Sequence, residues 1–413
     1  MKKAAIFFGA LLLVGVGISG PAVGSASADE LEEACQGQLI SDRPQDQLGV
    51  EAANRVSTGK NAQTGKAVVV AVVDSGVQGD NPHFKGALAT GKSFVSGRAD
   101  RDSAIQGTAV AGLIAARLIE GESGVVGIAP DAKIMPVRVY ESFADDAQQP
   151  DPELTAQGIE WAIDHGAEII AIPHALPMDS HKKLEQAVAR ARGKALIVAS
   201  AGNISQEVPD GTLVYPSGYT QTGKPSRSSN PVISVTAVDE QGYHQDGSTI
   251  ANPHVELAAP GQNVLTTAGK GDCLVPSGEP SAAYATGYVA GAAALVAAAY
   301  PDESPIDWKY RLLATASRSD NNHSDAVGWG IVAPYEALNF VNDGGMAGPP
   351  NPVPNYNQPP KVAPQPIEIP EPAPDYDPQV WTGVGWIVAA VIFITSFAIL
   401  AAQLRSRRNQ AGQ

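Results

Sequence analysis

The sequence predicts a doubly wound α/β domain with a mostly parallel sheet flanked by helices, followed by one C-terminal transmembrane helix. Three observations predict it. Apolar, β-branched runs recur between residues 66 and 238, segments with helical patterns separate them, and a long apolar stretch follows a proline-rich segment near the C-terminus. Runs that are apolar on both faces suit the central strands of parallel sheets, which helical crossovers connect.

The individual elements follow from the local patterns. The runs expected as strands are 66–74, 132–139, 168–172, 195–200 and 232–238. The expected helices are 107–118, which is rich in small residues, and the amphipathic segments 153–165 and 182–192. Functional groups collect at the carboxyl ends of strands in such sheets, where Asp74 and Asn203 both fall. These two residues are therefore candidates for a site.

Composition excludes several classes of function. The chain has 413 residues with 28 Lys and Arg against 43 Asp and Glu, a formal charge of −15. This acidic balance argues against nucleic acid as the main partner, because phosphate binding needs a basic face. Two cysteines exclude a disulfide-built scaffold and a four-cysteine zinc site. No metal or cofactor is expected.

The N-terminus has the features of a secretory signal peptide. Lys2 and Lys3 precede the apolar run 4–18, and the small residues Ser-Ala-Ser-Ala follow at 25–28. A basic start, a short apolar core and a small-residue cleavage pattern predict that residues 1–28 are removed. Residues 29–44 are then an N-terminal extension, and the main domain is expected over 45–345.

Residues 346–379 are expected to form a linker. From Pro349 to Pro378 the chain has 12 prolines in 30 residues. Such a stretch forms no core and favours extended polyproline conformations. The linker is therefore predicted to act as a semi-rigid spacer between the main domain and the C-terminal apolar stretch.

Residues 380–404 are expected to span a membrane once. The stretch is long enough to cross a hydrocarbon core of about 30 Å, and tryptophans stand near its start at 381 and 386. Arg405, Arg407 and Arg408 follow it. Because positive charge stays cytoplasmic, the tail 405–413 is expected inside the cell and the main domain outside the cell membrane.

Several segments of the main domain resemble the motifs of one known enzyme family. Residues 72–77 (Val-Val-Asp-Ser-Gly-Val) resemble the family's aspartate segment, and residues 107–116 (Gly-Thr-Ala-Val-Ala-Gly-Leu-Ile-Ala-Ala) resemble its histidine helix. Residues 198–203 (Val-Ala-Ser-Ala-Gly-Asn) resemble the segment of the oxyanion asparagine, which is Asn203 here. Further matches lie at 127–132, 258–261 and 288–296. Over residues 45–340 the chain thus resembles the subtilisin-like serine proteases, the subtilases, and this resemblance implies the subtilisin-like fold.

The order of segments along the whole chain indicates a particular group within this family. With its signal peptide, proline-rich linker and anchor, the chain resembles the mycosins, membrane-anchored subtilases associated with actinobacterial type VII secretion. That resemblance implies a place on the extracytoplasmic side of the cell membrane, with components of a type VII secretion membrane complex as partners. A peptide segment in the groove is a further partner that the resemblance implies.

The catalytic triad departs from the family's pattern. The family uses a serine nucleophile, a histidine base and an aspartate that orients the histidine, and Asp74 matches the aspartate. The histidine lies in Gly-His-Gly-Thr, where residues 105–108 read Ile-Gln-Gly-Thr, so Gln106 stands at the histidine position. Counting back without gaps from residues 289–291 (Val-Ala-Gly) places Ala283 at the serine position. An amide is no base near neutral pH, and a methyl group is no nucleophile.

These departures predict a catalytically inactive structural component of the secretion system. In subtilisin itself, loss of the serine or the histidine lowers turnover by about 10⁶-fold, and the two losses are not additive. Asn203 is then interpreted as a residue that is kept as part of the fold, since no acyl intermediate forms for it to stabilise. The sequence Pro173-His174-Ala175 replaces the Ser-x-Gly edge that pairs with substrate, and a proline removes one N–H from that edge.

Alternatives remain open at this stage. An active endopeptidase with Ser281 as a displaced nucleophile is one, although Ser281 is also in place to be the N-cap of a helix. His174 is either a substitute base or a packing residue. A cell-surface binding module unrelated to secretion is the third alternative. Cys35 and Cys273 are expected to pair if the domain lies outside the membrane, although two free thiols are the alternative.

Overall fold

The computed structural model describes residues 43–119, 123–143, 147, 149–179, 181–205, 208–220, 229–275, 278–344, 346–352 and 378–410. They fall into two units, a larger one that ends before Pro360 and a second one that contains the helix α10 (Pro378–Gln410). The expected signal peptide 1–28, residues 29–42 of the extension, Cys35 and residues 353–377 of the linker lie outside the described residues.

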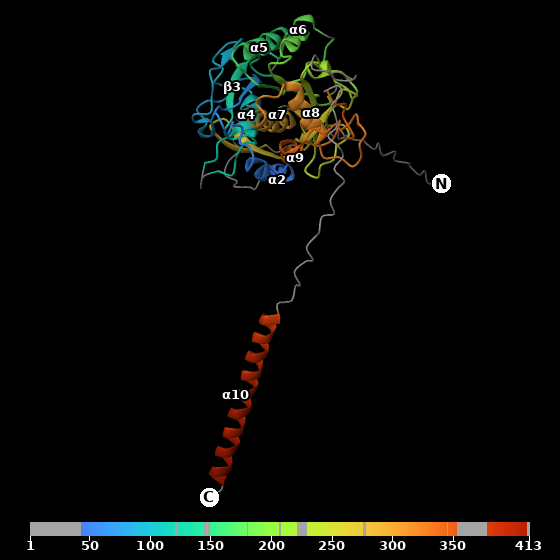
Figure 1. Ribbon diagram of the computed structural model, residues 1–413. Coiled ribbons are helices and arrows are strands. Elements are labelled where there is room, and N and C mark those ends of the chain that lie inside the picture. Colours follow the sequence, from blue (N-terminus) through green and yellow to red (C-terminus); the bar gives the residue numbers. More distant parts are fainter. Residues whose placement is uncertain are drawn as a thin grey trace, which may run out of the picture. The chain divides into compact units, whose positions relative to one another are not determined.

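A seven-stranded parallel sheet forms the centre of the larger unit, with the strand order β2-β3-β1-β4-β5-β6-β7 (Figure 1). The expected parallel α/β architecture is thus confirmed. The five predicted strands form β1, β3, β4, β5 and β6, and the sequence reasoning missed β2 and β7. The strand bounds are β1 Val69–Asp74, β2 Lys92–Ser93, β3 Lys133–Arg138, β4 Ile169–Ile172, β5 Leu196–Ser200, β6 Val232–Val238 and β7 Leu257–Pro260.

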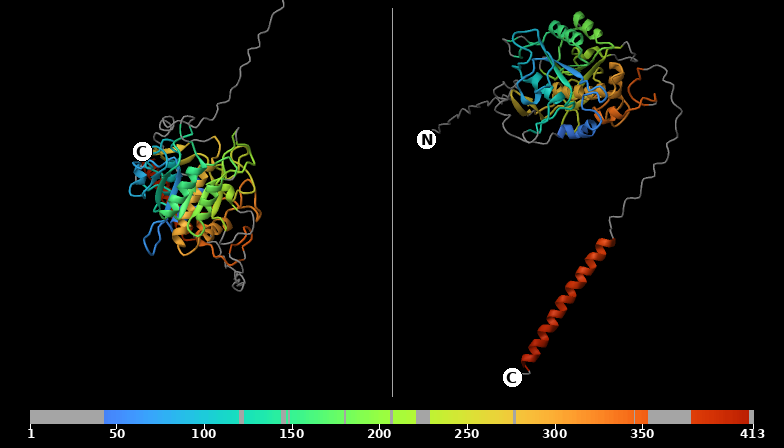
Figure 2. Two further views of the ribbon diagram at one scale, coloured as in Figure 1. Left: turned by 90° about the horizontal axis from the view of Figure 1, so that it is seen from above. Right: turned by 60° about the vertical axis from the view of Figure 1, so that its left-hand side comes forward.

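Helices cover both faces of this sheet, as its two apolar faces require. The predicted helices form α4 (Gln106–Ala115), α5 (Pro152–Asp164) and α6 (Lys182–Arg190). α5 and α6 pack together on one face, whereas α4 and α7 (Ala282–Ala299) pack together on the other, each pair over its own hydrophobic cluster (Figures 1 and 2). The remaining α-helices of the larger unit, among the described residues, are α2 Arg43–Gln47, α3 Val50–Asn54, α8 Pro305–Ala314 and α9 Pro334–Asn339.

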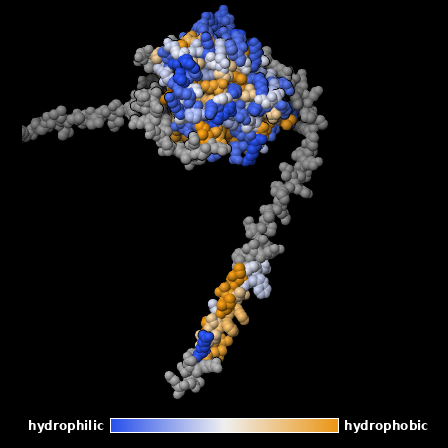
Figure 3. All heavy atoms as spheres, turned by 90° about the vertical axis from the view of Figure 1, so that its left-hand side faces the viewer, coloured by the Kyte–Doolittle hydropathy of each residue, from blue (hydrophilic) through white to orange (hydrophobic). Residues whose placement is uncertain are grey.

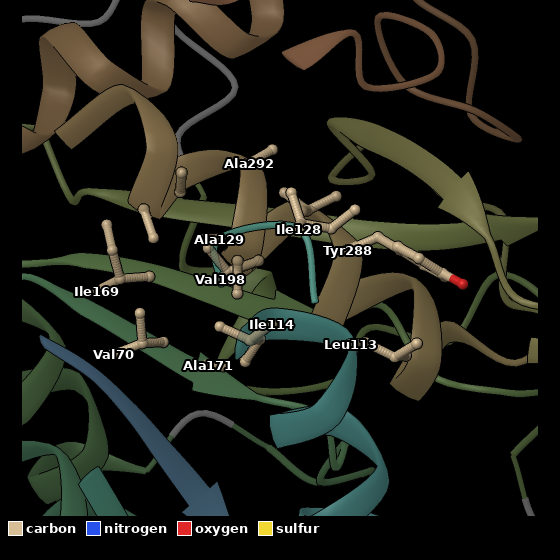
Figure 4. Packing of buried hydrophobic residues seen from close by; sticks show 14 of the residues in the cluster. Val70, Leu113, Ile114, Ile128, Ala129, Ile169, Ala171, Val198, Tyr288 and Ala292 are labelled. Atoms are coloured by element: carbon tan, nitrogen blue, oxygen red, sulfur yellow. The ribbon is translucent and has the colours of Figure 1, made fainter. Parts of the chain in front are cut away.

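Small residues allow α7 to lie deep in the core. α7 is apolar and long enough to cross a membrane, but most of it is buried inside the domain. At Gly291 an added Cβ would stand 2.6 Å from Ile128 Cβ, and at Gly287 it would stand 3.1 Å from Leu113 Cβ. Figure 4 shows Ile128 and Leu113 close to α7 residues Tyr288 and Ala292. Helix α7 is therefore a core helix, and its glycines set its distance from α4 and from the loop that follows α4.

Helix α10 differs from α7 in that its apolar segment is not buried in the domain. Its segment Gly385–Arg405 is apolar, long enough to cross a membrane and exposed along its length. Figure 3 shows the mostly hydrophobic surface of this helix. The predicted membrane-spanning segment thus exists as a continuous helix of sufficient length.

A small hairpin outside the main sheet was not predicted. β8 (Val264–Ala268) and β9 (Gly271–Val275) pair antiparallel, and Asn81 Nδ2 donates to the Gly269 and Gly271 carbonyls at their turn. Cys273 on β9 is disulfide-bonded. Because Cys35 lies outside the described residues, the Cys35–Cys273 pairing stays a prediction.

His83 and Asp272 form an ion pair that ties this hairpin to the domain. The buried His83 ring places Nδ1 2.6 Å from the Arg117 carbonyl oxygen and Nε2 2.6 Å from Asp272 Oδ1. Burial lowers the pKa of His83, but the hydrogen bonds to Asp272 and to the Arg117 carbonyl outweigh it and raise that pKa. Burial raises the pKa of Asp272, but the hydrogen bonds from His83 and Ser123 outweigh it and lower that pKa.

This pair makes stability depend on pH. With a raised folded-state pKa, the contribution of His83 is full below 6.5, its ordinary value, and is lost as the pH rises through the raised pKa. With a lowered pKa, the contribution of Asp272 is full above 3.8 and is lost as the pH falls through the lowered pKa. We expect His83→Gln to lower the free energy of unfolding by about 1 kcal/mol at pH 6 and by much less at pH 9, measured by urea denaturation. Equal losses at both pH values would contradict a charged pair.

Candidate functional site

Polar residues gather where four neighbouring parallel strands end. Asp74 ends β1, and Tyr140, His174 and Asn203 follow β3, β4 and β5 by two or three residues. A cavity of about 160 Å³ opens beside them, and its walls include Gln106, His174, Asn203 and Ala283. The structure therefore brings together the aspartate, the asparagine and the two positions that the sequence predicts to be degenerate.

Asp74 lies at the floor of this region and is fully buried. The Tyr140 hydroxyl donates to its Oδ1 at 2.9 Å, and Ser75 Oγ lies 2.9 Å from the same oxygen. Gln106 Nε2 donates to Oδ2 at 3.1 Å. Burial and the charge of Asp74 raise the pKa of Tyr140 well above its ordinary value, so its phenol stays protonated and keeps donating. Gln106 thus holds Asp74 through an amide N–H where a triad would have an imidazole.

Close backbone packing fixes Gln106 beside Asp74. A Cβ added to Gly107 would stand 2.0 Å from the Gly76 carbonyl oxygen, so only glycine lets α4 begin this close to β1. Ile105, just before Gln106, has a left-handed φ of 64°, which is costly for a β-branched side chain. Its side chain packs into the core cluster, which offsets part of that strain. The chain thus keeps the tight turn that aims residue 106 at the aspartate.

Asp102 anchors the same turn and was missed by the sequence reasoning. Its Oδ1 accepts from the Ala104 and Ile105 N–H groups, and its Oδ2 accepts from the N–H and hydroxyl of Thr108. Burial raises the pKa of Asp102 more than these hydrogen bonds lower it. An aspartate shortly before a predicted helix is a capping signal, and this signal was present in the sequence. Asp102 holds the start of α4 in place and lies outside the cavity wall.

Asn203 holds the start of α7. Its Oδ1 accepts from the Ala282 N–H at 2.9 Å, and its Nδ2 donates to Ser281 Oγ at 3.3 Å. Ser281 has the backbone position of an N-cap, but its side chain makes no capping hydrogen bond. The cap acceptor is supplied instead by Asn203, from the end of β5.

This arrangement predicts unequal effects of two substitutions. Asn203→Ala removes the acceptor of a helix-terminal N–H and should lower the free energy of unfolding by about 1 kcal/mol in urea denaturation. Ser281→Ala is the matched control and should change it by less than about 0.5 kcal/mol, since no cap bond is lost. A larger loss for Ser281→Ala than for Asn203→Ala would contradict this assignment.

His174 is buried in the cavity wall, 3% exposed. Its Nδ1 lies 3.6 Å from Asp74 Oδ2, its Nε2 lies 3.0 Å from Thr155 Oγ1, and its ring packs edge-on against Tyr140. The hydroxyl that contacts His174 Nε2 thus belongs to Thr155, which is fully buried on α5 and does not line the cavity. Although His174 lines the cavity, its hydroxyl partner Thr155 has no access to a substrate carbonyl there.

The described residues around the cavity offer hydrogen-bonding groups from Gln106, His174 and Asn203. In the described part of the chain, no hydrogen bond joins Ser281 to a histidine, and Ala283 contributes a methyl group to the cavity. A nucleophile with an adjacent base is what acyl transfer requires. The cavity also has apolar walls at Phe143, Pro173 and Val214, which suit contact with a side chain or peptide.

Comparison with known proteins agrees with this fold. The model of the Subtilase family matches residues 65–330, more than half of the chain. Mycosin-3 of Mycobacterium tuberculosis (strain ATCC 25618 / H37Rv) is 30% identical over 346 residues, which cover 73% of this chain and 74% of mycosin-3. Subtilisin DY of Bacillus licheniformis is 31% identical over 255 residues, 61% of this chain and 85% of that protein.

A solved structure has the same fold. It is that of the MycP3 protease from the type VII (ESX-3) secretion system, with a TM-score of 0.61 and 29% sequence identity. The match covers 74% of this chain and 90% of that chain.

Proposed function

Because this chain belongs to the subtilase family, as its family match and its similarity to mycosin-3 show, we propose that it is a catalytically inactive, mycosin-like member that serves as a structural component of a type VII secretion system. The observation that carries the proposal is the contact between Gln106 and Asp74 beside Ala283. The site keeps the carboxylate and the helix that oriented a base, but it offers neither the base nor the nucleophile. The remaining features are a folded domain with the cavity described above, which we call the groove, and the apolar helix α10.

The membrane arrangement is part of the same proposal. Helix α10 anchors the protein, the positive residues after position 404 keep the tail in the cytoplasm, and residues 45–345 lie on the extracytoplasmic side. The signal peptide 1–28 delivers the domain there. In that oxidising location Cys35 is the partner of the disulfide-bonded Cys273, since the chain has two cysteines, and the bond ties the extension to β9.

The groove is proposed to hold a peptide segment without cutting it. Its walls combine apolar side chains with the amides of Gln106 and Asn203, which donate and accept hydrogen bonds. Pro173 directly follows β4 and has no N–H, which weakens pairing of a peptide with this edge. Binding there is therefore expected to be weak by itself and to need contacts elsewhere.

Similarity to a protease from a type VII secretion system supports the link to secretion. The MycP3 protease belongs to a type VII (ESX-3) secretion system by its title, and this chain resembles it over most of both lengths. The experiment is purification of the full chain from membranes in mild detergent. Membrane components of a type VII secretion system should copurify in stable amounts, whereas their absence would favour a cell-surface binding module unrelated to secretion.

The second candidate is an active endopeptidase that uses Ser281. The observation in its favour is the contact of Ser281 Oγ with Asn203 Nδ2, at the position of the oxyanion asparagine. It predicts that a fluorophosphonate labels the protein and that Ser281→Ala abolishes the labelling.

A further inference from the structure

The negative charge of the buried Asp74 needs compensation, because Gln106 stands where a triad would have a histidine. A fully buried carboxylate is costly unless a positive charge or several hydrogen bonds compensate it. Its Oδ1 faces Tyr140 and Ser75, and its Oδ2 faces Gln106 and His174. Gln106, Tyr140 and Ser75 are neutral donors. Among these neighbours, His174 alone can carry a positive charge.

Hydrogen-bond directions fix one proton of His174. Thr155 Oγ1 lies 2.8 Å from the Asp151 carbonyl oxygen, which can only accept, so the threonine hydroxyl donates its proton to that carbonyl. Thr155 Oγ1 must then act as an acceptor toward His174 Nε2, which lies 3.0 Å away. The Nε2 atom therefore carries a proton.

The other ring nitrogen faces a carboxylate. His174 Nδ1 is buried and has no hydrogen-bond partner among the described residues, and the nearest acidic atom is Asp74 Oδ2 at 3.6 Å. An unprotonated Nδ1, which is buried, would direct its lone pair toward a negatively charged oxygen, which is unfavourable. A protonated Nδ1 turns this repulsion into attraction.

We infer that His174 is held as an imidazolium whose charge compensates Asp74, replacing the compensation that a triad histidine would provide. His174 is thus a positioning residue: it keeps Asp74 ionised and so keeps Gln106 and Tyr140 bound to it. The nearest other carboxyl group is that of Asp102, which Ser75 separates from Asp74. An imidazolium has no free nitrogen to accept a proton, so His174 does not serve as a substitute base.

The charge state can be read directly from the full chain in detergent. With histidine labelled by ¹⁵N in the ring, both nitrogens of His174 should give the shifts of a protonated imidazole at pH 7, with the signals assigned by their loss in His174→Gln. The exposed His165 is the reference histidine. An unprotonated ring nitrogen in His174 at pH 7 would overturn the inference.

A paired substitution provides a second readout. His174→Gln should lower the urea midpoint of unfolding, because Asp74 loses its compensating charge, and adding Asp74→Asn should restore part of the loss. The matched control, His165→Gln with Asp74→Asn, should show no such restoration. Additive losses for His174→Gln and Asp74→Asn would contradict the pairing, and if these variants do not fold, the ring shifts of the parent protein decide. If His174 is neutral and no serine probe labels the protein, this inference is wrong, whereas the proposal of a catalytically inactive site still holds.

Discussion

Restoring both lost groups, by Gln106→His together with Ala283→Ser, is expected to create a reactive serine without changing secretion. Residue 106 already contacts Asp74, and residue 283 already lines the same cavity as Asn203, so the new side chains enter positions where a relay can form. In subtilisin the serine and the histidine are each worth about 10⁶-fold in turnover. Peptide hydrolysis should therefore rise from background by several orders of magnitude.

The single variants are the controls for this experiment. Gln106→His alone lacks a nucleophile and Ala283→Ser alone lacks a base, so both should remain at background, because the groups act as a unit. In a deletion strain, the parent and the double variant should support secretion equally well. Secretion that only the double variant restores would mean that the pathway needs proteolysis by this chain.

Removing the anchor is expected to have the second largest effect. A chain that ends after Pro349 lacks α10 and should leave the membrane fraction completely. The segment Gly385–Arg405 contains ten Leu, Ile, Phe and Val residues, each of which contributes about 0.3–0.6 kcal/mol to insertion, so several kcal/mol of membrane affinity disappear. Secretion should fail, because a scaffold must remain with its complex.

The control for the anchor is a chain in which an unrelated transmembrane helix replaces residues 380–404. It should restore both membrane association and secretion if the helix acts as an anchor alone. Full secretion by the chain that ends after Pro349 would contradict the scaffold role, even if the protein were catalytically inactive.

Much of the fold was predictable because its central strands have an unambiguous pattern. The run at β1 is apolar on both faces and ends in Asp74, which predicted both a central strand and a residue at its carboxyl edge. Strands β8 and β9 were missed because β8 contains two threonines and β9 exposes part of one face, so neither gives a continuous apolar run. The hairpin depends on contacts with Asn81 and His83, which are distant in sequence.

The site was predictable in its residues but not in their contacts. Asp74, Gln106, Asn203 and Ala283 were identified from motifs, whereas Tyr140 was missed although it follows the end of β3 by the same rule that singled out Asp74. No local pattern shows that Asn203 binds Ala282 or that His174 lies against Asp74. The His174–Asp74 contact arises because the neighbouring strands β4 and β1 end at one edge, although these residues are 100 positions apart. Asn203 instead meets the start of helix α7, 79 positions further along the chain.

The most direct test of the inactive site is labelling of the purified, full-length parent protein with a fluorophosphonate probe, followed by mass spectrometry of the modified peptides. No serine should be labelled above the level of the heat-denatured protein, and casein should stay intact, while the double variant supplies the positive control. Stoichiometric labelling of Ser281, or of any other serine, would show that the chain activates a nucleophile and would contradict the account.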